Sequence, residues 1–174
     1  IPALEELHSN IIDEDNKIAE VAENCFHVQR GTYFKIGDVT HAACGGAFSI
    51  DRKYRQFGLS WWPQEEPNIF ELQKFQDALE KNPTVVLTHD VPMRHSIQKG
   101  DDPDFVYNTD VRCNLEKALS ASKATPLYWF FGHYHILKEE EIKGTTYYCC
   151  GLEGQFWDVW YPDIKPEKGG KWCV

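Results

Sequence analysis

Residues 127–135 carry the strongest indication of the fold class: Leu127-Tyr128-Trp129-Phe130-Phe131-Gly132-His133-Tyr134-His135. The first five residues of this stretch, 127–131, form a continuous apolar run, which is typical of a strand that is covered on both faces of a sheet. Residues 84–92 repeat the arrangement, because the short β-branched run 84–88 leads directly into His89, Asp90 and Pro92. Two buried strands that each end in a polar turn predict a layered α/β domain.

Helical spacing is found beside both of these strands. Before residues 84–88, the positions that follow the helical period are mostly apolar: Ile69, Leu72, Phe75, Gln76 and Leu79. Pro67 precedes them and fits the first turn of a helix. Between the two strands, the same spacing predicts a second helix through Val111, Leu115, Ala118 and Leu119.

Antiparallel pairs are predicted on either side of this central region. Residues 32–36 and 39–44 flank Gly37-Asp38, and residues 136–141 and 145–150 flank Lys143-Gly144. Short turns of this composition between two strand-like runs are hairpin signals.

Four further segments are assigned by composition. Residues 19–29 alternate partly and read as strand, whereas residues 49–67 form a long ordered loop. Residues 1–10 read as a short helix, and residues 156–161 as a last strand. We therefore expect one domain over residues 1–174.

The composition excludes several classes of protein. The formal net charge of −9 argues against a nucleic-acid partner, because phosphate backbones require a basic surface. No apolar run reaches the length of about 20 residues that a membrane span needs, and the first residues do not resemble a signal peptide. The six cysteines form no CxxC pair, so we expect reduced thiols and a cytoplasmic protein. The chain begins with Ile1, so we expect either processing or a longer parent protein.

The histidines at the ends of the two buried strands are the candidate metal ligands. In an extended chain His133 and His135 point to one side, where they can serve two metals about 3.5–4 Å apart. Gly132 lets the backbone approach such a cluster. His89 occupies the same position after the other strand, and the two sites converge if the strands are neighbours. Asp90 is expected to orient one of these imidazoles by contacting it without binding the metal itself.

Each of these signals is weak when it stands alone. A single histidine after a strand is usually a cap or a surface group, and an HxH tripeptide is common. Their joint occurrence at two strand ends favours a metal site. The remaining histidines, His8, His27, His41 and His95, read as structural or exposed, and His41 is of most interest among them because it precedes a Gly-Gly turn.

These motifs resemble those of calcineurin-like metallophosphoesterases. Gly132-His133-Tyr134-His135 is similar to the GHxH motif, and Thr88-His89-Asp90-Val91-Pro92 to the preceding single-histidine motif. Residues 45–52 and 60–65 resemble a stretch of a bacterial and phage branch, and the similarity covers roughly residues 16–161. The resemblance implies a two-sheet sandwich flanked by helices. It also implies two divalent metal ions, one bound by His89 and His133 and the other by His135.

The chain departs from the family pattern in its carboxylate motifs. No DxH or GNH occurs, and Gly100-Asp101-Asp102-Pro103-Asp104 matches GDxxD only by letters and in the wrong order. The three histidines would therefore need acidic ligands from an N-terminal segment or a second chain. The domain is accordingly predicted to be partial.

The substrate side is predicted at Asp51, Arg52 and Trp61, with Trp62 beside them, because arginine suits bidentate phosphate contacts. The alternative is a salt bridge with an aromatic packing cluster. No residue is assigned as the catalytic group.

Two functions remain open from the sequence. The first is hydrolysis of a phosphate mono- or diester, in a small molecule or a larger substrate, with Mn, Fe, Zn or Ni as the metal. The second is a truncated or degenerate domain that binds a partner through an exposed sheet edge and catalyses nothing.

Overall fold

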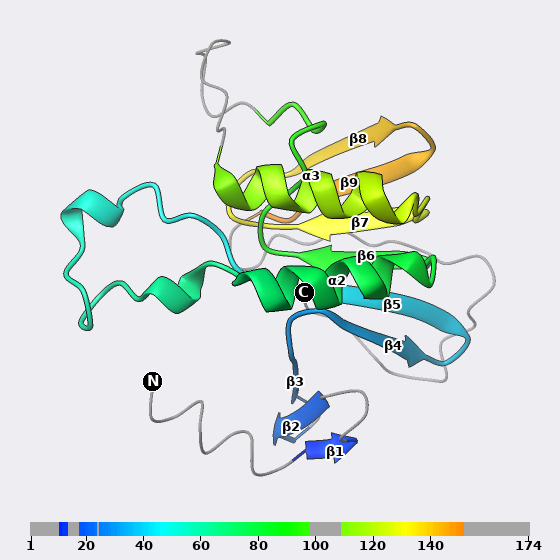
Figure 1. Ribbon diagram of the computed structural model, residues 1–174, viewed down its shortest axis with the longest axis horizontal. Helices are drawn as coiled ribbons and strands as arrows, with labels where there is room; N and C mark the ends of the chain where they lie inside the picture. The colour runs from blue at the N-terminus through cyan, green and yellow to red at the C-terminus, as the bar shows by residue number, and fades with distance from the viewer. Residues whose placement is uncertain (1–10, 14–17, 24, 98–108, 152–174) are drawn as a thin grey trace.

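The computed structural model describes residues 11–13, 18–23, 25–97 and 109–151 (Figure 1). The helix predicted at residues 1–10, the strand at 156–161 and the GDxxD-like residues 100–104 lie outside these ranges. The described residues form a mixed α/β structure with a six-stranded sheet, a three-stranded sheet and two α-helices. The predicted α/β class is therefore confirmed.

The six-stranded sheet has the order β4-β5-β6-β7-β9-β8. Its strands are β4 (Thr32–Ile36), β5 (Val39–Cys44), β6 (Val85–Thr88), β7 (Tyr128–Phe131), β8 (Lys138–Ile142) and β9 (Thr145–Cys149). The inner strands β5, β6, β7 and β9 are parallel to one another, and each edge is an antiparallel hairpin. Parallel strands direct all of their carboxyl ends to one edge of the sheet, where ligands usually bind.

Most strand predictions are confirmed, with small shifts at the ends. The hairpin at residues 32–44 has the predicted bounds, and Ile36 pairs with Val39 across the Gly37-Asp38 turn. The second hairpin begins at Lys138 instead of at residue 136. The segment predicted at 19–29 is two strands, β2 (Ile18–Ala22) and β3 (Cys25–Val28), which pair with each other and with β1 (Ile11–Asp13) in the smaller sheet.

Both α-helices lie over the same face of the six-stranded sheet (Figure 1). They are α2 (Ile69–Glu80) and α3 (Asp110–Ser122), and both bury the residues that the helical spacing indicated, apart from the exposed Ile69 and the partly buried Gln76. The placement of Pro67 in the first turn of α2 is wrong. Asn68 caps the helix instead, because its Oδ1 accepts hydrogen bonds from the Phe70 and Glu71 amides at 2.9 and 3.0 Å. Capping by asparagine satisfies amides that have no partner within the helix.

The helix-covered face of the sheet forms the core. Trp129, fully buried, packs edge-on against Phe75 of α2 and stacks on Tyr147, with ring centroids 6.2 and 5.6 Å apart. Burial of apolar surface on this scale is the main driving force for the fold. Because β-strand side chains alternate, the neighbouring residues point to the opposite face.

That opposite face, which we call the second face, is also apolar. Its most continuous row runs across the paired residues Ala43, Leu87, Phe130 and Tyr148. The Phe130 and Tyr148 rings stack with centroids 5.1 Å apart. A parallel sheet normally has both of its faces covered.

A long ordered loop leaves β5 and returns at α2, as the sequence predicted. It contains the short helices η2 (Arg52–Tyr54) and η3 (Pro63–Glu65), and Figure 1 shows it extending to one side of the sheet. Of the helices in the described part of the chain, none has the length and apolarity required to cross a membrane.

Candidate metal centre

His89 and His133 meet at the carboxyl edge of the six-stranded sheet. β6 and β7 are adjacent and parallel, and the residues that follow them are held together by a bond from the Gly132 amide to the His89 carbonyl, 3.1 Å long. The two imidazole rings lie with their centroids 5.2 Å apart, edge to face. The convergence expected of neighbouring strands is therefore present.

The extended conformation predicted for the HxH tripeptide is wrong. His133 and His135 both have left-handed backbone conformations, with φ of 69° and 58°, and the Tyr134 amide donates to the Gly132 carbonyl at 2.8 Å. The chain thus turns through the motif. His135 is exposed, and its interaction with His89 lowers the pKa of His89, so the third histidine lies within electrostatic reach of the pair.

Because the backbone of His133 is left-handed, glycine at this position should give a more stable protein than alanine. A side chain with a Cβ is strained by about 1 kcal/mol or more in this region, whereas glycine is not. We expect the His133→Gly protein to be more stable than His133→Ala by about 1 kcal/mol in urea denaturation.

The matched control is the exposed Gln73 in α2, where the order reverses and alanine is more stable than glycine by about 1 kcal/mol. Alanine equal to or better than glycine at position 133 would show that His133 is not held in this conformation.

Asp90 connects the turns that follow β6 and β7. It is fully buried, and its Oδ1 accepts hydrogen bonds from the Val91 amide at 2.8 Å and from the Tyr134 hydroxyl at 2.6 Å. Burial, together with this carboxylate, raises the pKa of Tyr134. Tyr134 lies between His133 and His135, so Asp90 positions the histidine motif through Tyr134. The predicted contact of Asp90 with an imidazole stays a prediction.

The two adjacent histidines are candidates to share one divalent ion. The pKa of His89 is lowered, mainly because surrounding atoms partly exclude water from its ring. The charge of Asp90 opposes this shift, and His135 adds to it. A neutral imidazole is the form that binds a metal. Two imidazoles bound to one tetrahedral ion place their ring centres about 5 Å apart, because each nitrogen lies about 2 Å from the metal. The separation of 5.2 Å fits this requirement.

A pocket of about 170 Å³ lies against these two histidines. It is lined by Gly46, Ala47, Ser49, Glu65, His89 and His133. Ser49 and Glu65 come from opposite ends of the long loop, and sequence reasoning assigned neither of them to the site. Over residues 11–13, 18–23, 25–97 and 109–151, no three His, Cys, Asp or Glu side chains are grouped closely enough to hold one ion.

The predicted substrate residues lie on the long loop and do not line this pocket. Asp51 pairs with Arg55 at 2.7 Å, and Arg52 pairs with Glu66 at 3.7 Å. The Arg52 guanidinium covers the Trp61 ring at 3.8 Å, and Trp61 is only 8% exposed. These contacts are those of the alternative, a salt bridge with an aromatic packing cluster. A role for Asp51, Arg52 or Trp61 in binding substrate stays a prediction.

His95 is fully buried, although the sequence placed it among the structural or exposed histidines without a specific environment. Its ring packs against Phe131 and Tyr147, with centroids 5.0 and 5.5 Å away. Its Nε2 lies 3.2 Å from the Glu140 carboxylate. Burial lowers the pKa of His95 to about 4, although the Glu140 charge opposes that shift. His41, by contrast, stacks on Phe34 at 5.1 Å and does not line the pocket.

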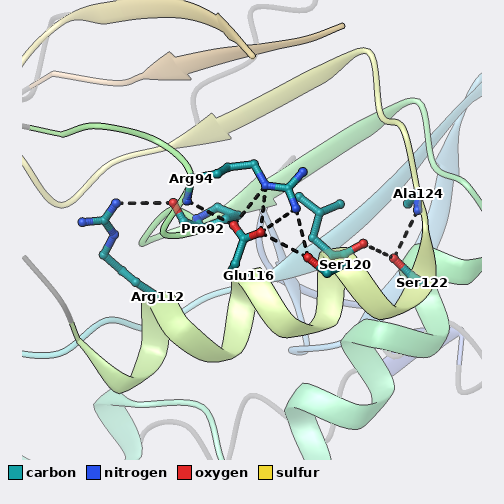
Figure 2. Close-up of polar contacts among 8 residues, drawn as sticks. Pro92, Arg94, Arg112, Glu116, Ser120, Ser122 and Ala124 are labelled. Atoms are coloured by element: carbon teal, nitrogen blue, oxygen red, sulfur yellow. Dashed lines mark hydrogen bonds and ion pairs between the residues drawn. The ribbon is translucent and has the colours of Figure 1, made fainter. Parts of the chain in front are cut away.

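Two arginines attach the segment after His89 to α3 (Figure 2). Arg112 is fully buried and donates to the carbonyls of Val91, Pro92 and His95 at 3.1, 3.3 and 2.5 Å. Arg94 forms a partly exposed pair with Glu116 at 2.6 Å. These bonds fix the backbone immediately downstream of His89 and Asp90.

No protein-family model matches the chain, and no curated protein matches it significantly. The resemblance to calcineurin-like phosphoesterases rests on the motifs themselves and stays a hypothesis.

Proposed function

We propose that this chain is the histidine-bearing part of a two-metal phosphoesterase of the calcineurin-like type. The observation that carries the proposal is the meeting of His89 and His133 at the carboxyl ends of adjacent parallel strands, with ring centroids 5.2 Å apart. His89 and His133 would hold one ion, and His135 would be a ligand of the other. The pocket beside His89 and His133 offers the space in which a phosphate group would lie.

The finer form of the fold belongs to the same proposal. The second face carries an apolar row across four strands, and apolar sheet faces are stabilised by packing on another sheet about 10 Å away. We propose a two-sheet sandwich in which a further sheet covers this row. That sheet, from a segment outside the described residues or from a second chain, would supply the acidic ligands.

Bound divalent ions would polarise the phosphoryl group and supply a nucleophilic hydroxide near neutral pH. The residues of this chain have separate roles. His89 and His133 would provide the nitrogen donors, and Asp90 keeps the histidine motif in place through Tyr134. A mixed nitrogen and oxygen donor set suits Mn, Fe, Zn or Ni. The substrate would be a phosphorylated small molecule or another phosphoester.

A second function stays open, a degenerate domain with a binding role. Such a domain would also lack three ligands around one point, as the described residues do. The two proposals differ in whether the complete protein turns over a phosphoester.

Hydrolysis of p-nitrophenyl phosphate and bis-p-nitrophenyl phosphate in the presence of Mn²⁺ tests the proposal. The complete protein is compared with its His89→Ala variant and its His133→Ala/His135→Ala variant. Loss of metal ligands removes several kcal/mol of transition-state stabilisation, so we expect kcat/KM to fall by about 100-fold or more.

The matched control is His27→Ala, because His27 lies on β3 in the smaller sheet and does not line the pocket. Its kcat/KM should stay within about twofold of the wild type. Metal-dependent turnover that survives in the His133→Ala/His135→Ala protein would contradict the phosphoesterase proposal. An absence of turnover in the wild-type protein would favour the binding domain.

A further inference from the structure

Glu65 is the one carboxylate among the six residues that line the pocket beside His89 and His133. It comes from the far end of the long loop, well separated in sequence from both histidines. A carboxylate in a pocket that is meant for a phosphate group repels that group unless a cation lies between them.

The side chain of Glu65 is held as a hydrogen-bond acceptor. Its Oε2 accepts a hydrogen bond from the Ser49 hydroxyl, and its Oε1 accepts one from the Trp62 amide at 3.2 Å. Each carboxylate oxygen can accept a further bond, because an ionised carboxylate has about four acceptor positions.

The backbone of Glu65 is fixed as well. Its carbonyl accepts from the Ala47 amide at 3.1 Å, and Arg30 donates to the flanking carbonyls of Gln64 and Glu66 at 2.7 and 3.2 Å. Gly46 makes this approach possible, since its φ is 106° and a Cβ there would lie 2.6 Å from the Glu65 carbonyl oxygen. Glu65 thus lines the pocket from an anchored loop, and its Oε2 is bonded to the hydroxyl of Ser49, which lines the same pocket.

Glu65 and the two histidines do not form a direct three-ligand set in this arrangement. The pocket of about 170 Å³ has room for several solvent molecules, each occupying about 30 Å³ in the liquid. A solvent molecule bound to a cation is a strong hydrogen-bond donor, and a fixed carboxylate is its natural acceptor.

We propose that Glu65 is an outer partner of a divalent cation held by His89 and His133 and contacts that cation through one bound solvent molecule. The inference rests on the proposed function for the cation itself and adds the residue that balances its charge. Outer carboxylates of this kind contribute about 10- to 100-fold to metal affinity.

The test is a Co²⁺ titration of the full chain, followed by the visible absorption of the bound ion. Glu65→Gln keeps the size of the side chain and removes its charge, and we expect it to weaken Co²⁺ binding by about tenfold or more. The matched control is Glu66→Gln, because Glu66 pairs with Arg52 and does not line the pocket. Its affinity should stay within about twofold of the wild type.

Two further variants separate the possible failures. If His89→Ala binds Co²⁺ as the wild type does, the histidine site fails and the Glu65 proposal fails with it. If His89→Ala loses binding and Glu65→Gln does not, only the Glu65 proposal is overturned. Should Glu65→Gln not fold in thermal unfolding, Glu65→Ala replaces it, since alanine removes the charge without placing an amide donor beside the Trp62 amide and the Ser49 hydroxyl. Unchanged affinity in Glu65→Ala would then overturn the proposal.

Discussion

The Arg112→Met protein is expected to lose about 3–5 kcal/mol of its free energy of unfolding. Arg112 is fully buried and donates hydrogen bonds to three backbone carbonyls of the loop after β6, those of Val91, Pro92 and His95. Methionine has a similar length but no donor, so it leaves these acceptors buried. Each unsatisfied buried acceptor costs about 1–3 kcal/mol, and this change leaves three of them.

Urea denaturation measures this loss, and Arg94→Met is the matched control. Arg94 donates to Glu116, which lies on α3 as Arg112 does. Because the Arg94–Glu116 pair is partly exposed, removing the Arg94 guanidinium should lower the free energy of unfolding by about 1 kcal/mol or less. Figure 2 shows Arg94 on the loop and Arg112 on α3; Arg94 is partly exposed, whereas Arg112 is fully buried. A loss below about 1 kcal/mol in Arg112→Met would mean that the loop after His89 does not depend on these bonds.

Acid is expected to destabilise the protein through His95. The pKa of His95 is about 4 in the folded state, below the ordinary value of 6.5 that applies to the unfolded chain. Between these values the unfolded state binds the proton and the folded state does not. The stabilising contribution is therefore fully present above pH 6.5 and is lost as the pH falls toward 4, by about 3 kcal/mol in total.

The free energy of unfolding, measured from pH 7 to pH 4, tests this expectation with His95→Leu. Leucine cannot take up a proton, so the variant should lose about 3 kcal/mol less than the wild type over this range. Glu140, Lys138 and Arg112 are the charged groups that act on His95, and the Glu140 charge raises its pKa. Glu140→Gln should therefore extend the acid-sensitive range to lower pH. Parallel pH profiles for the wild type and His95→Leu would contradict the assignment.

Local patterns in the sequence were sufficient to predict most strands of the six-stranded sheet. The turn at Gly37-Asp38 defines the first hairpin to the residue, because two-residue turns fix the register of the strands they join. The apolar runs before His89 and His133 correctly predicted buried strands. The position of Pro67 was misjudged because Asn68, a strong capping residue, determines where α2 begins.

The conformation of the site depended on contacts that sequence spacing does not contain. His133 and His135 were expected in extended chain, but the bond between Tyr134 and Asp90 holds the motif in a turn, and it joins residues 44 positions apart. Glu65 reaches the pocket because Arg30 and Gly46 anchor the loop that carries it. No local pattern marks such a carboxylate. The sequence classed His95 only as structural or exposed for the same reason, because its burial comes from Phe131 and Tyr147 on other elements.

The order of the strands also bears on how the chain reaches its native state. The two hairpins at the sheet edges each close over a two-residue turn, and contacts that are local in sequence form fastest. β6 and β7 pair only after the chain has crossed over through α3, which requires a longer loop closure. The meeting of His89 and His133 thus requires the pairing of β6 with β7. A cation bound between these histidines would stabilise the native sheet and not the unfolded chain.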